Sequence, residues 1–287
     1  MGELSAKERV HLLTEKLEQG ILQMVEGEEY KRYLSFMARF PHYSFGNVML
    51  ILMQRPDATL VQSFTAWKKI GRSVKKGEKG IRILAPSPFK VKVKTKEKDE
   101  NGKEVIKEEE KKVMGFREVF TFDVSQTEGL ELPSSGVKEL KGAIEDFETL
   151  FSILREVCPV PFKFEEIDGS ARGYYQLEPE QIVVRKGMAQ QQTVKTLVHE
   201  MVHQQLHNLE QKKKKDRNTK EVEAESVAFV VCSALGIDTS DYSFGYVAGW
   251  SSNKDLKELK SSLTTIQKTA WEFVQRIENK LQEKRRE

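Results

Sequence analysis

The spacing of hydrophobic residues in the first half of the chain predicts helices followed by short strands. A helix over residues 6–26 is indicated by apolar side chains that recur every three or four positions, namely Val10, Leu13, Leu17, Ile21 and Met24. Two more helices are expected over 28–40 and 44–54, and the first should stop before Pro41. Short β-type runs, including Ile81–Ala85, then alternate with glycine-rich loops.

Lysine and glutamate dominate the stretch from residue 90 to residue 112. Its period of two and its Asn101-Gly102 pair predict a β-hairpin. Because few of its positions could enter a core, we expect the hairpin to project into solvent, and we assign it no function. The run 117–129 then returns the chain to the sheet.

The segment LELPSSG, at residues 130–136, is typical of a linker and places a domain boundary near residue 133. We therefore expect two domains, 1–132 and 133–287, in an α+β protein whose N-terminal domain contains a small mixed sheet. The elements predicted in the second domain are a helix over 137–157, a strand over 162–166, a hairpin over 171–186, a helix that carries histidines, a lysine-rich loop over 211–220, a helix over 221–236 and a long helix from about 253.

Composition fits a globular protein, with 38% hydrophobic and 32% charged residues and a formal net charge of +3. The charge is uneven, since Trp67–Lys96 holds 11 lysines and arginines but a single acid, Glu78. Such a cluster predicts a local anionic partner. Cys158 and Cys232 lie in apolar surroundings, which favours reduced thiols and a cytoplasmic location. No apolar run reaches membrane-spanning length, so no membrane partner is expected.

Three of the five histidines fall in the stretch VKTLVHEMVHQQLH. His199 and His203 are one helical turn apart, so both rings project from one face and can each give a nitrogen to Zn²⁺. Glu200, beside the first ring, is placed to take a proton from a water molecule at such a metal. An HExxH string can arise by chance. Here, however, Val194, Leu197, Val198 and Val202 make the helix a core helix, in which unsatisfied imidazoles are costly.

A third ligand is expected from the following helix, KEVEAESVAFVV. Glu221 and Glu225 lie on its apolar face, whereas Glu223 points away. We expect Glu221 to bind the metal and Glu225 to orient a ligand histidine, although the reverse stays open, as does a helix with exposed rim glutamates. His207 is expected to support the ligands from behind or to end the helix, and not to bind the metal.

These strings resemble a known group of metallopeptidases. TLVHEMVHQQLH followed by EVEAESVAF is similar to gluzincin-type enzymes of the ImmA/IrrE group, which use two histidines and a glutamate on the next helix. GYYQLEPEQIVVRKG resembles the edge hairpin that lines their substrate cleft. FGYVAGWSSNKDLKELKSSL is similar to the closing segment of ArdC-type antirestriction proteins, whose C-terminal domain is a zincin. The resemblance implies a zincin-like C-terminal domain with one Zn²⁺, although another divalent metal is possible.

The N-terminal half is similar to the same family. The strings that carry this resemblance are YSFGNVMLILMQRPDATLVQSFTAWKKIGRSVKKGEKGIRILAP and FTFDVSQTEG. The resemblance implies binding of single-stranded DNA, coupled to a metallopeptidase and encoded on conjugative elements. It therefore implies a role in antirestriction, in which the protein protects incoming DNA during transfer.

The residues themselves suggest where the DNA would bind. A cluster rich in basic side chains could contact phosphates, and its members are Trp67, Lys68, Lys69, Arg72, Lys75, Lys76, Lys79 and Arg82. Bases could stack on nearby aromatic rings, namely Trp67, Phe64, Tyr43 and Phe45. The alternative is a solvated lysine-rich loop with Trp67 in the core.

We therefore expect a zinc metalloendopeptidase that binds single-stranded DNA and cuts an unidentified protein. The side chains that could stabilise the oxyanion are Tyr174, Tyr175, His207 and Tyr246, and the sequence does not choose among them. Two alternatives remain open. One is a protective DNA-binding protein whose zinc is structural, and the other is an ImmA-like peptidase that cleaves a repressor.

Overall fold

The chain is described here by a computed structural model. The structure describes residues 4–25, 27–98, 104–132, 147–207 and 215–284. Four predicted features lie wholly or partly outside these ranges: the Asn101-Gly102 turn, the boundary near residue 133, the first part of the helix predicted over 137–157 and residues 211–214 of the lysine-rich loop. Within the described residues the protein is a mixed α/β structure with small sheets.

Three helices open the chain at the predicted places: α1 (Ala6–Met24), α2 (Gly27–Met37) and α3 (Phe45–Gln54). A capping box begins α1, because the Ser5 side chain accepts from the Glu8 amide and the Glu8 carboxylate accepts from the Ser5 amide. Ser44 caps α3 in the same manner through the Asn47 amide. Their apolar faces pack together and against the first sheet.

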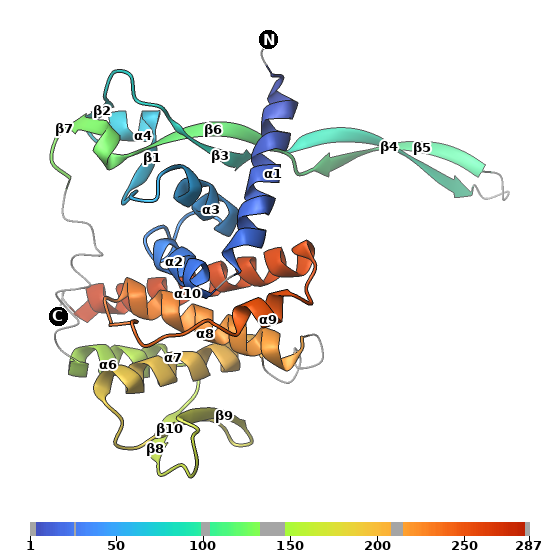
Figure 1. Cartoon of the computed structure of the whole chain (residues 1–287). Coiled ribbons are helices and arrows are strands. Elements are labelled where there is room, and N and C mark those ends of the chain that lie inside the picture. The colour runs from blue at the N-terminus through green and yellow to red at the C-terminus, as the bar shows by residue number, and fades with distance from the viewer. Residues whose placement is uncertain (1–3, 26, 99–103, 133–146, 208–214, 285–287) are drawn as a thin grey trace.

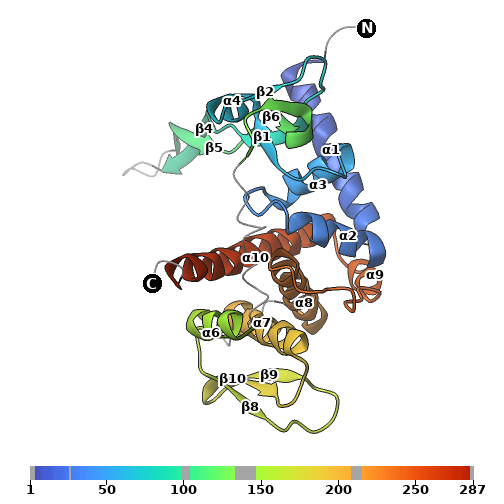
Figure 2. The ribbon, with the colours of Figure 1, turned by 90° about the vertical axis from the view of Figure 1, so that its left-hand side faces the viewer.

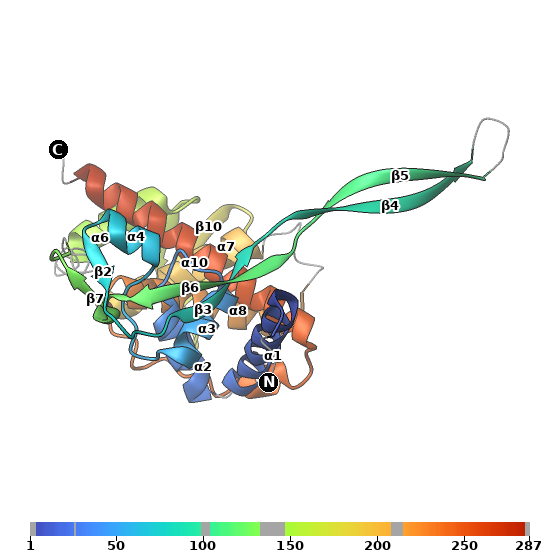
Figure 3. The ribbon, with the colours of Figure 1, turned by 90° about the horizontal axis from the view of Figure 1, so that it is seen from above.

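The first sheet is antiparallel, in the order β1-β6-β3, and not mixed as predicted. The bounds of its elements and their neighbours are β1 (Val61–Ser63), α4 (Phe64–Lys69), β2 (Arg72–Val74), β3 (Ile81–Pro86), β6 (Phe116–Asp123), a 3-10 turn at Val124–Gln126, and β7 (Thr127–Gly129), which pairs with β2. The charged hairpin forms a two-stranded ribbon of β4 (Phe89–Lys98) and β5 (Glu104–Val113). It projects from the molecule as the sequence predicted (Figures 1 and 3).

The second half adds a helical layer and a second sheet. Its elements are α6 (Phe147–Val157), β8 (Phe162–Glu165), β9 (Gly173–Leu177), β10 (Glu180–Arg185), α7 (Gln190–Leu206), α8 (Arg217–Ala234), α9 (Val247–Ser251) and α10 (Leu256–Lys284). The sheet order is β8-β10-β9, with β8 parallel and β9 antiparallel to β10. Figures 1 and 2 show the layers: the first sheet, α1–α3, then α8 with α10, then α6 with α7, and the second sheet.

One hydrophobic core joins the two halves. Helix α2 packs on α8, and α1 and α3 contact α10. At the centre of this interface the hydroxyl groups of Tyr30 and Ser226 lie 2.8 Å apart, both buried. The layers that carry the two halves are therefore held in contact by apolar packing and not only by the chain between them.

One predicted boundary was wrong, and two short elements were missed. Helix α8 begins at Arg217 and not at residue 221, because Asp216 caps it by accepting from the Thr219 amide at 2.9 Å. The strand β2 and the short helix α9 were not predicted, since each is too short to show a periodic pattern.

Cys158 and Cys232 are both free thiols. Among the described residues, no helix is both long and apolar enough to cross a membrane.

Candidate metal centre

Helix α7 holds the histidines between the second sheet and α8. Its buried face includes Val194, Leu197 and Val198, as the sequence predicted for a core helix. Strand β9 approaches this helix closely at Gly173, where an added Cβ would lie only 2.7 Å from Thr196 Cγ2. Glycine is therefore needed at this position for the edge strand to lie against the helix.

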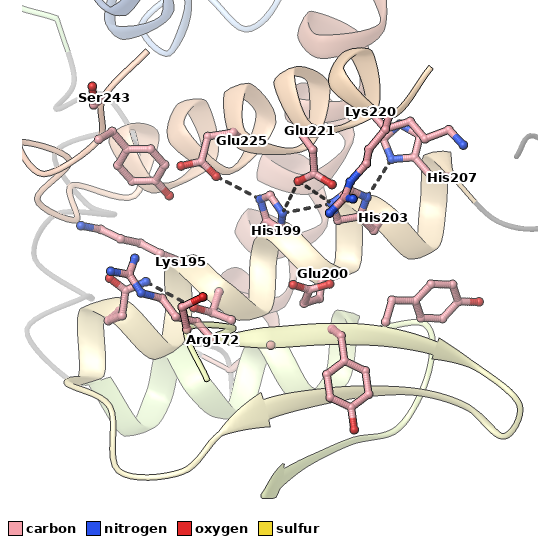
Figure 4. Close-up of a pocket in the computed structure, with 18 of the residues that line it drawn as sticks. Arg172, Lys195, His199, Glu200, His203, His207, Lys220, Glu221, Glu225 and Ser243 are labelled. Carbon is pink, nitrogen blue, oxygen red and sulfur yellow. Dashed lines mark hydrogen bonds and ion pairs between the residues drawn. The ribbon is translucent and has the colours of Figure 1, made fainter. Parts of the chain in front are cut away.

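Three donor atoms converge between α7 and α8 (Figure 4). The Nε2 atoms of His199 and His203 are 3.0 Å apart, and Glu221 Oε2 lies 3.6 Å from each. Donors ~2.0–2.1 Å from a tetrahedral zinc ion lie roughly 3.3 Å from one another. The observed separations bracket that value, so these residues fit a divalent cation, and they form a group that could hold one within the described part of the chain.

Glu225 stands on the other side of the first histidine. Its Oε2 lies 3.1 Å from His199 Nδ1, the nitrogen turned away from the donor cluster. The contact is poorly aligned with the ring N–H, which leaves Nδ1 without a well-directed hydrogen bond. The structure thus places Glu221 beside the two Nε2 atoms and Glu225 behind the His199 ring. These positions are compatible with the roles predicted from the sequence, which stay predictions.

The carboxylates around His199 change the pKa of its ring. Burial alone would lower this pKa, but the contacts with Glu221 and Glu225 outweigh burial and raise it to about 10. The same contacts with His199 and His203 hold the pKa of Glu221 well below its usual range. Without a metal, the cluster therefore keeps a proton on His199 at neutral pH.

Glu200 faces the cleft from the same helix (Figure 4) and is 7% exposed. Burial raises the pKa of Glu200, while the charges of His199 and His203 act in the opposite direction. The carboxylate also accepts a hydrogen bond from the Tyr175 backbone N–H on β9. A carboxylate whose pKa is raised towards neutrality is suited to accept and release a proton.

The donor cluster opens into a cleft of about 700 Å³ between α7, α8 and β9. Of the four residues considered for the oxyanion, Tyr246 does not line this cleft. Tyr175 lines it, but its hydroxyl donates to Glu180 at 2.7 Å. His207 also lines the cleft, but both of its ring nitrogens contact other side chains. Tyr174 lines the cleft from β9 and is partly exposed.

Sequence reasoning misplaced one glutamate. Glu223 was expected to point away to solvent, but it is 0% exposed and contacts His207 and Lys215. Lys215, in the loop before α8, was not considered at all. The sequence pattern indicated the burial of Glu223 only weakly, because this side chain is surrounded by apolar residues only after α8 has packed on α10.

The prediction that Trp67 stacks on bases is wrong. Its side chain is 0% exposed, and its indole N–H donates to the Phe122 carbonyl at 2.8 Å. Tyr43 and Phe45 also pack against the core, and the Tyr43 hydroxyl donates to the Val61 carbonyl. The alternative that Trp67 belongs to the core was the correct one, because its ring fills the space between α4 and the first sheet.

The predicted basic residues divide into groups. Lys76, Lys79 and Arg82 line one groove of about 1210 Å³ above β3 and β6. Arg72 instead joins β2 to β7 through Thr127, and Lys75 donates to the Ser125 carbonyl. The remaining two, which are exposed on α4 outside the groove lining, are Lys68 and Lys69.

Three residues that sequence reasoning missed also line the groove: Arg9 from α1, Arg55 after α3, and Phe120 from β6. Phe120 is 53% exposed and lies opposite Arg82 in the strand register. Its exposure follows from strand alternation, since Thr121 beside it faces the core. The two carboxylates of the lining are Glu78 and Glu118.

Comparison with known proteins agrees with this N-terminal architecture. Residues 5–122 match the family described as the N-terminal domain of anti-restriction factor ArdC. Residues 5–122 are thus similar to the ArdC N-terminal domain, as the sequence strings predicted. The matched residues include the lining of the basic groove except Gln126, and they end before the donor cluster on α7 and α8.

Individual relatives are distant. An uncharacterized protein of Bacillus anthracis, pXO2-81, is 27% identical over 299 aligned residues, which cover 91% of this chain and 49% of that protein. The chain therefore spans about half the length of this relative. Among solved structures, the metal-free crystal structure of the antirestriction ArdC protein from the R388 plasmid has a TM-score of 0.49 at 18% identity, with 84% of this chain and 86% of that chain covered. The Mn(II)-bound form has a TM-score of 0.44 at 18% identity, with 84% of each chain covered.

Proposed function

We propose that the protein binds single-stranded DNA and cleaves a protein with a zinc-dependent peptidase site. The observation that carries the peptidase proposal is the convergence of His199 Nε2, His203 Nε2 and Glu221 Oε2 beside the buried carboxylate of Glu200. Metal analysis of the purified chain, with cleavage of unfolded casein as the probe for turnover, tests this half. Gel shifts on single-stranded against duplex oligonucleotides test the other.

The proposed chemistry divides between the metal and the chain. A bound zinc ion would polarise a peptide carbonyl and acidify a water molecule. Glu200 accepts the proton of that water, because its carboxylate is buried, has a raised pKa and is held by the Tyr175 amide. The cleft beside β9 gives an extended peptide a place to lie, since β9 is the edge of its sheet.

The basic groove supports the DNA proposal. Five cationic side chains and two carboxylates line it, so the groove has an excess of positive charge that can contact phosphates. The exposed ring of Phe120 beside Arg82 offers a surface for an unpaired base, in the role first considered for Trp67. The similarity of residues 5–122 to the ArdC N-terminal domain favours a role in antirestriction, which we extend to protection of incoming DNA in conjugative transfer.

Metal binding is expected to release about one proton at pH 7. The reason is that the pKa of His199 is raised to about 10 in the metal-free chain, and a protonated imidazole has no lone pair for a metal. Apparent affinity for Zn²⁺ should therefore rise with pH, roughly tenfold per unit while His199 remains protonated. Calorimetric titration in buffers with different ionisation enthalpies measures the released proton.

Glu225→Gln is the matched variant for that experiment. It removes the charge of one carboxylate that raises the pKa of His199, and the amide keeps the shape of the glutamate side chain. It should release a smaller fraction of a proton at the same pH. Equal heats in every buffer for the original chain would contradict a protonated His199.

Replacing Phe120 with alanine is expected to weaken binding of single-stranded oligo(dT) by about 1–3 kcal/mol, the usual value of one stacked base. Lys79→Ala should instead lower the slope of log affinity against log salt by about 0.7, as expected for one lost phosphate contact. Fluorescence anisotropy at several salt concentrations measures both effects.

Phe164→Ala provides the control, since Phe164 is also a partly exposed phenylalanine on a strand but belongs to the second sheet. Its oligo(dT) affinity should match that of the original chain. If Phe120→Ala and Lys79→Ala both bind unchanged, the groove is not where DNA binds.

A further inference from the structure

His203 has a second contact on the side away from the donor cluster. Its Nε2 faces His199, and its Nδ1 lies 3.0 Å from His207 Nδ1 (Figure 4). A metal-binding histidine commonly uses its other nitrogen to donate to a group that fixes the ring. Here that group is another imidazole, one helical turn further along α7.

His207 is itself held from behind. It ends α7, its side chain is 4% exposed, and its Nε2 lies 3.3 Å from Glu223 Oε2. Lys215 Nζ donates to both oxygens of Glu223, at 2.6 and 2.8 Å. A continuous chain of contacts therefore runs from His203 through His207 and Glu223 to Lys215.

The buried carboxylate determines where the protons lie along this chain. Glu223 can only accept hydrogen bonds when ionised, so His207 must present an N–H at Nε2. The Nδ1 of a neutral His207 is then an acceptor, and His203 donates to it from Nδ1. The Nε2 of His203 consequently keeps its lone pair directed at the donor cluster, as a metal ligand requires.

The opposite tautomers are unfavourable at this position. A proton on His207 Nδ1 would turn the lone pair of Nε2 towards Glu223, which is fully buried. Two acceptors facing each other without a shared proton would leave buried polar atoms unsatisfied, which is costly. Lys215 balances the charge of Glu223 in either case, so it holds the carboxylate ionised.

We propose that His207, Glu223 and Lys215 are positioning residues that fix the ring orientation and the tautomer of His203. This inference rests on the metal site of the proposed function. It adds Lys215, from the loop before α8, and Glu223, from the buried side of α8, to the metal-site residues that the sequence indicated.

The first experiment compares metal affinities by competition between the full-length chain and a chelator, with Co²⁺ and Zn²⁺ as probes. Lys215→Met and His207→Leu are expected to lose ~10–100-fold in affinity, the usual effect of removing a group that supports a ligand histidine. His207→Asn is the matched partner of His207→Leu, because the two side chains have similar shape but asparagine keeps an acceptor near the place of Nδ1. It should retain more affinity than His207→Leu.

Lys254→Met controls for a merely structural ion pair. Lys254 Nζ lies 2.6 Å from the carboxylate of Asp216, the residue that caps the start of α8. Asp216 accepts a hydrogen bond from the Thr219 amide and not from a histidine. This variant should lower the melting temperature but bind Co²⁺ like the original chain. Equal affinity of Lys215→Met, His207→Leu and the original chain would overturn the proposal, as would equal losses in His207→Leu and His207→Asn.

A second experiment needs no metal. Nitrogen-15 NMR of the histidine rings in the metal-free chain should find His207 protonated at Nε2 and bare at Nδ1, with a coupling across the bond to His203. A proton at His207 Nδ1 would overturn the inference. This result does not depend on whether the variants fold, because it is measured on the original chain. If the variants show the expected order of Co²⁺ affinities but the original chain cuts no protein, the proposed peptidase is refuted and the positioning role of the three residues stands.

Discussion

Replacing Glu200 with glutamine is expected to lower protein cleavage by ~10²–10⁴-fold, the usual contribution of a general base. The amide has nearly the same shape as the carboxylate but cannot accept the proton of an attacking water. Zinc content should stay unchanged, because Glu200 is not one of the three converging donors. Binding of single-stranded oligonucleotides should also persist, since the basic groove lies in the other half of the molecule.

Glu165→Gln is the control for this variant, because Glu165 is a partly exposed carboxylate on β8 that pairs with Lys163 outside the cleft. Cleavage of casein and protection of incoming DNA in a mating assay should be measured for both variants. Loss of both readouts only in Glu200→Gln supports the DNA-tethered peptidase. Undiminished protection by Glu200→Gln favours a protective protein whose metal site is structural.

Trp67→Ala is expected to destabilise the protein by about 3–5 kcal/mol, as for other large aromatic side chains removed from a core. The cost has two parts, because the substitution leaves a cavity between α4 and the first sheet and also removes the donor to the Phe122 carbonyl. Chemical denaturation monitored by circular dichroism measures the loss.

The milder Trp67→Phe separates folding from binding. It should cost less stability than alanine, because most of the buried volume remains filled, and oligo(dT) affinity at low temperature should equal that of the original chain. A folded Trp67→Phe that has lost its DNA affinity would restore the interpretation in which the indole stacks on a base.

The donor cluster was largely predictable because it depends on local periodicity. The spacing of His199 and His203 fixes both rings on one face of a helix, and the apolar residues around Glu221 indicate which face of the next helix is turned inward. The choice between Glu221 and Glu225 could not be made from periodicity alone, because both lie on that face. It depends on how α7 and α8 pack against each other in the folded protein.

The DNA surface was less predictable because it depends on contacts between distant segments. Charge clusters identify lysines, but strand alternation and packing decide which aromatic rings stay exposed. Phe120 and Arg9 come from β6 and α1, which are far from the lysine-rich loop in sequence and meet it only in the folded sheet. Trp67 was misread for the related reason that a residue beside two lysines can still face the core.

The packing of α2 on α8 has a consequence for synthesis in the cell. Tyr30 and Ser226 are separated by 196 residues, and a ribosome needs roughly 10–40 s to make that length at ~5–20 residues per second. During this interval the opening helices have an apolar face with no partner. A chaperone that shields the nascent helices until α8 and α10 emerge should therefore raise the yield of folded protein.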